Sequence, residues 1–441
     1  METAPILLAY LLPIGALLVA WGGWTDDRSR ENAASALLII AIAVIAYAAI
    51  GFAFQFGGVG LRPDAPIGLR GLDRMWSPVS TANNPWGVIG LEGFLLNAQS
   101  TASGDTALLF ALFLHQLPIV ITTTLIPALT LAGRVRNFTL VIIASITATI
   151  IVPIASMWSW GNGWLSTLGS AVNFGHGFID PGGASAAFFA AGMITLASLI
   201  ALKIRRISTE PIELPHLIAP LRSIFGAIVL GLGWLAWLLT DPFLQANRSI
   251  DLSFAASNIL LGAAAATLFS FAYSWFTTGK PNALLTSRSA MGGFIALAAS
   301  AAFVPTWAAI VIGGIAGLLT PIAIFVIDRL QLDDSSGSIA TAGLAGLWSL
   351  ISIGFLADGT YGAGWNNVGV KEYLGAAGQG VTGLLAKANL QNDPGQMSAQ
   401  ITGLLAIGLF AFVMSWLFIR PWRRLTKIHT LEHSLMPTDD E

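Results

Sequence analysis

Of the histidine and carboxylic acid side chains in this sequence, only His115 lies inside one of the long apolar stretches, in the segment FLHQLPIVITTT. A titratable group is costly inside a membrane, so His115 is a candidate for binding a cation or exchanging a proton. The alternative is a neutral imidazole that is hydrogen-bonded to a neighbouring helix or loop, and the sequence leaves both open. The adjacent Gln116 could line a path, although amides in such stretches more often join helices.

Two acidic residues open segments with the same layout, because DPGGASAAFFAAG begins at Asp180 and DSSGSIATAG begins at Asp334. Each carboxylate can cap a helix by accepting hydrogen bonds from its free backbone amides. Asp180 could also have a buried structural or electrostatic role. Eight residues further on, Phe188 and Ala342 lie about 12 Å along their helices. The pattern therefore predicts that these two residues reach the middle of the membrane from opposite faces.

Other polar residues give little sign of chemistry. Asp241, in LLTDPF, precedes Pro242, where helices commonly end. Nothing resembles a phosphate-binding loop, a nucleophile elbow or a metal cluster, so we expect no catalytic residue, cofactor or metal, and no enzyme. The chain has no cysteine, which excludes disulfides and thiolate metal sites. Its net charge of −2 indicates no surface for nucleic acid.

The composition predicts an all-α polytopic membrane protein. Of the 441 residues, 55% are hydrophobic and 10% are charged, and an apolar run of about 20 residues can cross a bilayer as a helix. We expect eleven such helices, near residues 5–22, 35–57, 106–131, 138–158, 184–202, 218–240, 253–275, 289–304, 307–327, 338–356 and 399–419. Pro305 separates the eighth from the ninth, and we expect a hairpin there because proline ends helices.

The distribution of Lys and Arg predicts an outside N-terminus and an inside C-terminus. With this topology, Asp180 and Asp334 open their helices from opposite sides of the membrane, so we expect two five-helix halves in an inverted-topology repeat. The halves are residues 5–202 and 218–356, the eleventh helix is 399–419, and together they form a membrane domain over 1–430. The cytoplasmic tail is 421–441, and the location is the cell (inner or plasma) membrane.

Two long loops, near residues 58–105 and 357–398, both fall on the outer side in this topology. They are rich in Gly, Asn and Trp and contain no run of charges. Their apolar content favours an ordered cap over the helices rather than a disordered linker.

Several motifs occur in a characteristic order: PIASMWSWGNGWL, GFIDPGGASAAFFAAG, GKPNALLTSRSAMGGFIAL, LDDSSGSIATAGLAGLWS, DGTYGAG and, in the tail, LEHS. With them the sequence resembles the ammonium transporter and Rhesus family over about residues 5–430. The resemblance implies a homotrimer in the lipid bilayer, with one narrow pore per subunit between the two halves and the eleventh helix packed along the outside. The cytoplasmic face of the family often docks a trimeric nitrogen-regulatory protein, and this tail keeps only LEHS of the longer motif.

The resemblance also assigns residues to the outer vestibule of the pore. The tryptophan around which ammonium is recruited falls on Trp160, and the acid that opens the fifth helix falls on Asp180. Gln116 matches a family glutamine, and His115 stands where an aromatic residue is usual. A vestibule serine falls close to Asp241.

The gate and the midplane of the pore depart from the family pattern. The two stacked phenylalanines that close the way in fall on Ile119 and Trp237. The two pore histidines fall on Phe188 and Ala342, so the polar relay of the family is absent. A bare ammonium ion that crossed such an apolar lining would lose hydration worth tens of kcal/mol.

Two hypotheses follow. In the first, the protein moves ammonium, ammonia or another small cation or neutral molecule by an altered route, with His115 and Asp241 recruiting the cation and Asp180 stabilising it. In the second, it is a non-conducting homologue in which Phe188 plugs the pore, and it serves as a structural or interaction subunit or as a sensor. The scaffold is retained over the full length, which favours the first.

Overall fold

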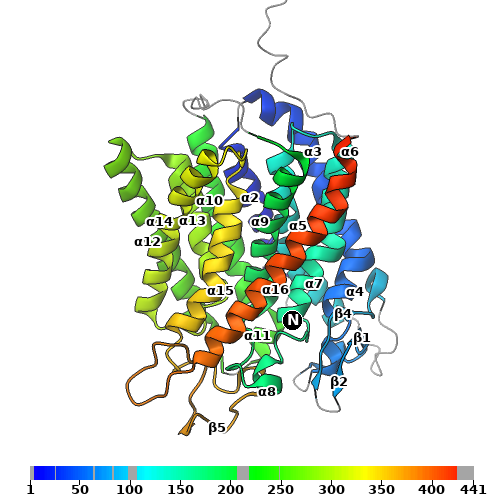
Figure 1. The fold of residues 1–441 in the computed structure, drawn as a ribbon, viewed down its shortest axis with the longest axis vertical. Coiled ribbons are helices and arrows are strands. Elements are labelled where there is room, and N and C mark those ends of the chain that lie inside the picture. Colours follow the sequence, from blue (N-terminus) through cyan, green and yellow to red (C-terminus); the bar gives the residue numbers. More distant parts are fainter. Residues whose placement is uncertain are drawn as a thin grey trace, which may run out of the picture.

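The computed structural model describes residues 4–24, 26–62, 65–81, 84–97, 107–205, 218–247 and 249–424. Long helices run between the two ends of the molecule (Figure 1). These helices are α2 (Leu11–Trp21), α3 (Asp26–Ala46), α5 (Ala107–Leu131), α6 (Asn137–Ile146), α7 (Val152–Ser159), α9 (Ala184–Leu202), α10 (Ile218–Leu239), α12 (Leu252–Thr278), α13 (Ala283–Ala296), α14 (Thr306–Arg329), α15 (Ala345–Leu356) and α16 (Pro394–Ile419).

Shorter elements complete the chain. The short α-helices are α1 (Ala4–Leu8), α4 (Phe52–Phe56), α8 (Leu168–Val172) and α11 (Pro242–Ala246). Three π-helical turns continue longer helices: η1 (Tyr47–Gly51), η5 (Thr147–Ile151) and η7 (Ile339–Leu344). The 3-10 turns are η2 (Val59–Leu61), η3 (Ile67–Leu69), η4 (Phe94–Leu96), η6 (Pro181–Gly183), η8 (Trp365–Asn367) and η9 (Arg420–Arg424).

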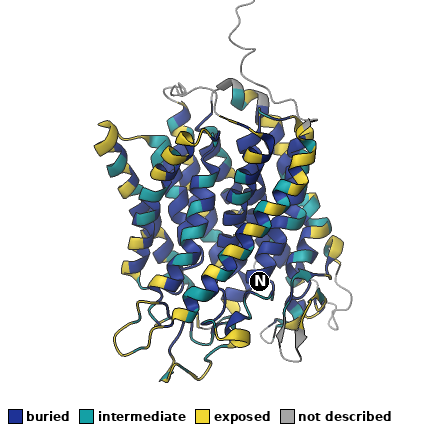
Figure 2. Cartoon of the chain, in the orientation of Figure 1, coloured by how far each residue is buried: buried dark blue, intermediate teal, exposed yellow. Residues whose placement is uncertain are grey.

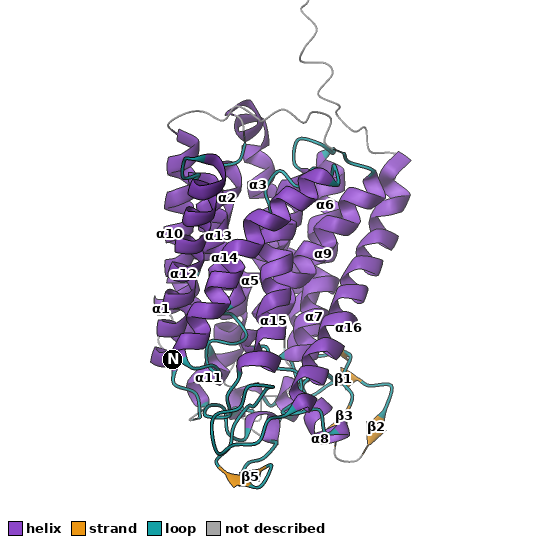
Figure 3. Cartoon of the chain, turned by 60° about the vertical axis from the view of Figure 1, so that its left-hand side comes forward, coloured by secondary structure: helices purple, strands orange, loops and turns teal. Residues whose placement is uncertain are grey.

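Six two-residue strands form antiparallel pairs, and they lie together at one end of the bundle (Figure 3). The strands are β1 (Met75–Trp76) with β4 (Ile89–Gly90), β2 (Ser80–Thr81) with β3 (Asn84–Pro85), and β5 (Glu372–Tyr373) with β6 (Ala376–Ala377). We call this end, which also carries α8 and α11, the loop face. Both predicted long loops contribute to it.

The helices match the predicted apolar runs in position. Within the described residues, nine helices are long and apolar enough to cross a membrane by length and composition, and Pro5–Trp21 is a shorter apolar helix. The segment α13, of 14 residues, corresponds to the eighth predicted run. It is followed by turns and then by α14, against which it packs, so the two segments form a hairpin rather than one long helix.

The predicted bounds of two helices differ most from the structure. The helix expected at 35–57 already begins at Asp26, because its first turns are polar and continue beyond the apolar run. The helix expected at 289–304 begins at Ala283 and ends at Ala296. The side chain of Asn282 caps it by accepting a 2.9 Å hydrogen bond from the Leu285 amide, and this cap lies upstream of the apolar run. Most of the predicted tail 421–441, with LEHS, lies outside the described residues.

Equivalent helices of the two predicted halves contact each other through glycine. The first helix of each, α2 and α10, pack closely, and a Cβ placed on Gly15 would lie 2.3 Å from the Leu230 nitrogen. The last helices, α9 and η7 with α15, also pack together, while α16 runs along the outside of the bundle against α9 and α15 (Figure 1). Small residues permit such backbone contact between apolar helices. Figure 2 shows that most residues of the central helices are buried and that the exposed residues lie toward the periphery.

The loop face is held to the bundle around His176. The amide of His176 donates a 2.9 Å hydrogen bond to Gln396 Oε1 in α16, and its carbonyl accepts one of 2.8 Å from Asn366 Nδ2. Its ring lies 4.3 Å from the ring of Tyr373, whose hydroxyl donates to Asp393 at 2.6 Å. Neither ring nitrogen has a hydrogen-bond partner among the described residues, and burial lowers the pKa of His176 to about 4. Burial also disfavours the charged form of Tyr373 and therefore raises its pKa, and the Asp393 carboxylate raises that pKa further.

The neutral, buried His176 is expected to make the stability of the fold depend on pH. In the unfolded chain the imidazole binds a proton below about pH 6.5, whereas in the fold it does so only below about 4, so stability is complete above 6.5 and falls as the pH drops toward 4. Between pH 7 and pH 5 the loss is about 2 kcal/mol. Thermal unfolding in detergent at both pH values measures it. His176→Phe keeps a ring but cannot titrate, so it should lose less stability than the wild type. An identical loss in both proteins would contradict the assignment.

Candidate functional site

An aromatic cluster lies where α7 ends near the loop face. Its centre is Trp160, which is only 4% exposed. The indole stacks with that of Trp365 at 6.0 Å between ring centroids, and Phe243 meets it edge to face at 5.7 Å. The guanidinium carbon of Arg62 lies 5.4 Å from the Trp160 centroid and 4.9 Å from that of Phe243. Aromatic faces attract cations, so this cluster is a surface that binds positive charge.

Next to it, the structure brings His115 and Asp241 together. Nε2 of His115 in α5 lies 3.4 Å from Oδ2 of Asp241, and both side chains are only 1% exposed. On the other side of the ring, Nδ1 lies 3.3 Å from the Thr240 hydroxyl. The other oxygen of Asp241 caps α11 by accepting hydrogen bonds from the Phe243 and Leu244 amides at 2.8 and 2.9 Å. Nε2 and Oδ2 make no well-aligned hydrogen bond to any described residue, and they face each other across the 3.4 Å contact.

Trp237 joins this pair to the start of α9. Its indole stacks on the His115 ring at 5.3 Å and 14°. It also covers Gly182, where a Cβ would lie 2.3 Å from the indole and where φ is +71°, so glycine is required twice over. Gln116 Nε2 donates a 3.1 Å hydrogen bond to the Gly182 carbonyl. The predicted site residues on α5 and α10 thus surround the turn that precedes α9.

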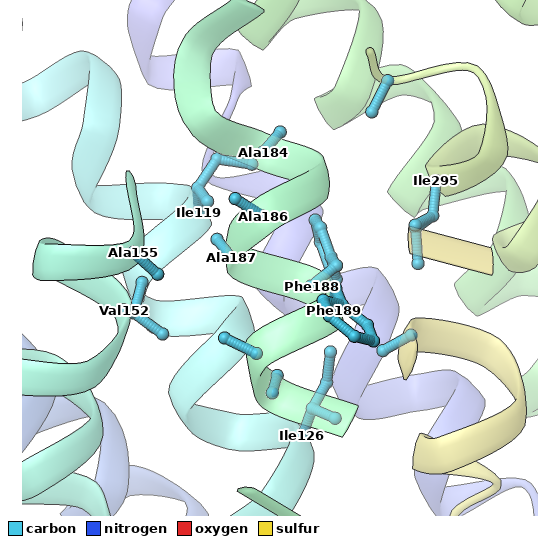
Figure 4. Packing of buried hydrophobic residues seen from close by; sticks show 14 of the residues in the cluster. Ile119, Ile126, Val152, Ala155, Ala184, Ala186, Ala187, Phe188, Phe189 and Ile295 are labelled. Carbon is cyan, nitrogen blue, oxygen red and sulfur yellow. The ribbon is translucent and has the colours of Figure 1, made fainter. Parts of the chain in front are cut away.

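The two predicted gate positions do not form an aromatic stack, because Ile119 is aliphatic and the stacking partner of Trp237 is His115. Ile119 is fully buried one turn further along α5 than His115. Figure 4 shows it beside the first turn of α9, with Ile126 beside a later turn.

Asp180 and Asp334 occupy equivalent places at the starts of their helices. The two oxygens of Asp180 accept hydrogen bonds from the amides of Ser185 and Ala186 at 2.9 and 2.8 Å. Asp334 accepts two amides at the start of η7, both at 2.8 Å. Burial raises the pKa of Asp334, while the amide bonds and the charge of Arg288 act in the opposite direction.

The predicted midplane positions are apolar and tightly packed. Phe188 is fully buried, and its ring lies 5.3 Å from that of Trp234 on α10. Ala342 is fully buried in η7. One turn beyond Phe188, a Cβ on Gly192 would lie 2.2 Å from the Cα of Gly343, so the backbones of α9 and η7 touch. Figure 4 shows the hydrocarbon side chains on this part of α9. The contact leaves no room for added atoms on Gly192.

Beyond the midplane, away from the loop face, three hydroxyls cluster. Ser338 Oγ lies 2.6 Å from both the Thr130 and Ser336 hydroxyls and donates a 3.1 Å hydrogen bond to the carbonyl of Ile126. Thr130 and Ser336 also contact each other. The hydroxyls therefore mark a polar layer between the apolar midplane and the far face.

At the far end, two guanidinium groups converge on Ser335. Arg28 Nη1 donates to its hydroxyl at 2.8 Å, and Arg288 Nη2 donates to its carbonyl at 2.6 Å. Arg288 is only 7% exposed and lies against Gly23, where a Cβ would be 2.5 Å from Nη2. Arginine side chains thus lie at both ends of the bundle, Arg62 at the loop face and Arg28 with Arg288 at the far end.

Several of these residues were missed in the sequence. Arg62 and Arg28 were treated only as charges that orient the chain, and nothing local distinguishes them. Trp234 could have been found, because it lies three residues before Trp237 and so shares its helical face. Arg288 lies inside α13, which begins at Ala283, whereas the apolar run predicted that this helix begins at residue 289.

The chemistry available follows from this arrangement. The described residues contain no group of three or more His, Cys, Asp or Glu that could hold a metal ion. The His115–Asp241 pair can accept a hydrogen bond from a polyatomic cation and can take up a proton. The midplane side chains of Phe188 and Ala342 can do neither.

Comparison with known proteins gives one family and many relatives. The model described as Ammonium Transporter Family matches residues 6–431. The ammonium transporter Amt2 of Archaeoglobus fulgidus is 29% identical over 283 residues, 63% of this chain and 59% of that protein. A putative ammonium transporter of Synechocystis is 26% identical over 76% of this chain and 66% of that protein. The chain thus spans less than two thirds of the length of these two relatives. An ammonium transporter of Bacillus subtilis is 22% identical over 94% of this chain and 89% of that protein.

Solved structures share the fold. A sensor Amt protein superposes with a TM-score of 0.73 at 20% identity, covering 96% of this chain and 92% of that one. Mep2 of Candida albicans also gives 0.73 at 20% identity, over 96% of this chain and 83% of that one.

Proposed function

Because the chain belongs to the ammonium transporter family, a family of membrane transporters rather than enzymes, we propose that it recognises ammonium at the His115–Asp241 pair and moves it across the membrane as neutral ammonia. The observation that carries this proposal is the buried 3.4 Å contact between the two side chains beside Trp237. It supplies a negative or proton-accepting group close to the aromatic cluster and before the apolar midplane.

Removal of the proton before the midplane follows from the cost of burying charge. An ammonium ion beside Phe188 would lose hydration worth tens of kcal/mol in the Born limit, and no side chain there replaces it. Neutral ammonia escapes this cost. In the proposed sequence the cation transfers one proton to the pair, ammonia passes once Phe188 swings aside, and the proton returns to the side from which it came. The net movement carries no charge.

The proposed setting is that of the family. The chain forms eleven spans in a cell membrane, with two inverted five-helix halves, the loop face outside and the N-terminus on the same side, and three copies assemble as a homotrimer with one pore each. The excess of Lys and Arg on the predicted inner side and the glycine contacts between equivalent helices support this arrangement. The LEHS motif in the tail is the one feature that supports docking of a cytoplasmic regulatory protein.

A second candidate function is supported by the packing of the midplane. Phe188 lies against Trp234, and the backbones of α9 and η7 touch, and this packing supports a midplane that is closed to substrate. A protein that binds ammonium outside and conducts nothing would act as a sensor or an interaction subunit. A protein named a sensor Amt protein shares this fold.

Two measurements on purified protein in liposomes separate these functions. An internal pH dye reports entry of ammonia as alkalinisation, and a solid-supported membrane reports current. We expect alkalinisation faster than in empty liposomes, without current, and a decrease of at least tenfold in that excess rate for His115→Phe and for Asp241→Asn.

Asp251→Asn is the matched control, because Asp251 also caps a helix with its side chain but is exposed. Its rate should equal that of the wild type. Current in the wild type would contradict neutral transport. Absence of both signals, with ammonium still bound, would favour the sensor.

A further inference from the structure

The aromatic cation site on the loop face is already occupied by the protein itself. The guanidinium of Arg62 lies within 6 Å of the centroids of both Trp160 and Phe243, at 5.4 and 4.9 Å. Its Nη1 also donates to the Trp160 carbonyl at 3.4 Å. Two ring faces and one carbonyl oxygen are the groups with which a small cation would be bound from outside.

Arginine is well suited to hold such a site closed. Its guanidinium is planar, permanently charged and weakly hydrated, so it stacks on aromatic rings at every physiological pH. A histidine or a lysine at this place would be a weaker or a pH-dependent competitor. The contact therefore behaves as a constant feature of the resting vestibule.

The surroundings fix both partners. The backbone of Arg62 ends η2, since its amide donates to the Val59 carbonyl at 3.2 Å and its carbonyl accepts from Ala65 at 3.1 Å. On the other side, Trp160 is held by its stack with Trp365, which in turn meets Phe303 edge to face at 4.9 Å. The cation site is thus preformed, and its occupant is attached to the chain.

We propose that Arg62 is a built-in competitor for the outer cation site, which an external cation must displace before it reaches His115 and Asp241. For ammonium as that cation, the inference rests on the function proposed above. A tethered group has an effective concentration in the millimolar range or above, so it lowers the apparent affinity for the external ion. The residue also selects by charge, because its positive field opposes cations but not neutral molecules.

Removal of the tethered charge tests this directly. Binding of labelled methylammonium to purified protein, displaced by ammonium chloride in a scintillation proximity assay, needs no transport. We expect the apparent affinity for ammonium to rise about tenfold in Arg62→Gln and to rise clearly less in Arg62→Lys, which keeps the positive charge but is the weaker competitor. Arg70→Gln is the control, because Arg70 is exposed and belongs to the same loop, and its removal changes the net charge equally. It should leave the affinity unchanged.

A second experiment replaces the tethered group by a free one. In Arg62→Ala, guanidinium chloride at low millimolar concentration should bind at the aromatic cation site, which Arg62 no longer occupies, and displace methylammonium. In the wild type it should have no effect. Direct titration calorimetry with guanidinium chloride gives the same comparison without any ammonium. Sodium chloride at equal ionic strength corrects for screening, and an unchanged thermal unfolding temperature confirms that Arg62→Ala folds.

The outcomes distinguish this inference from the proposed function. If guanidinium binds Arg62→Ala but ammonium and methylammonium bind no variant, the cation site stands and the ammonium function fails. If Arg62→Gln and Arg70→Gln raise the affinity equally, the effect is general electrostatics and the inference is overturned. It is overturned as well if guanidinium binds Arg62→Ala no better than the wild type.

Discussion

Gly192→Ala is expected to destabilise the protein by about 3 kcal/mol or more, which places it among the severe single substitutions. The new Cβ would lie 2.2 Å from the Cα of Gly343, and backbone atoms cannot rotate away as a flexible side chain can. The helices α9 and η7 would have to separate by about an ångström, and with them the midplane around Phe188. Thermal unfolding of the purified protein in detergent, together with the yield of folded protein, measures the effect.

The reciprocal substitution supplies a graded control. In Gly343→Ala the Cβ would lie 3.2 Å from the Cα of Gly192, a contact that needs a shift of only a few tenths of an ångström. Gly343→Ala should therefore destabilise the protein clearly less than Gly192→Ala does. Met193→Leu changes a neighbouring, partly exposed residue of similar volume and should be nearly neutral. Equal destabilisation by the two alanine substitutions would mean that the helices do not cross as described.

The double substitution Phe188→His with Ala342→His is expected to produce an ammonium-elicited current at least tenfold above the background signal, whereas the wild type is expected to produce none. Two imidazoles at these positions would offer hydrogen bonds and proton sites where the wild type offers only hydrocarbon, and so would reduce the cost of a charge at the midplane. The first change removes volume beside Trp234, and the second adds it on η7, which abuts α9, so the two partly compensate. Current on a solid-supported membrane is the measurement.

The single variants separate the effect of the added polar groups from the effect of the changed side-chain volume. Phe188→His alone should open space without a complete relay, and Ala342→His alone should overpack the site and lower stability. Neither single variant should produce a current as large as that of the double variant. If the double variant is folded but silent while the wild type already carries current, then ions cross by a route that does not pass Phe188, and transport as neutral ammonia is contradicted as well.

The sequence was sufficient for features that depend on residues near one another in the chain. The apolar runs predicted where the helices lie, because each span must be apolar over its own length. Family membership, too, was predicted from motifs and their order, and the family model over residues 6–431 confirms it. Helix ends were predicted less well, since Asp26 and Asn282 start their helices outside the apolar runs.

The site depended on contacts that only the tertiary structure makes. His115 and Asp241 belong to different helices and are remote in sequence, so the sequence could name each but could not place them 3.4 Å apart. Arg62 was indistinguishable from the other basic residues until the fold placed it over Trp160. The physical reason is that a side chain acquires its function from the charge, rings and burial around it, and in this protein those come from other helices and loops. The sequence by itself determined the family and the helical scaffold, and the packing decided which side chains meet inside it.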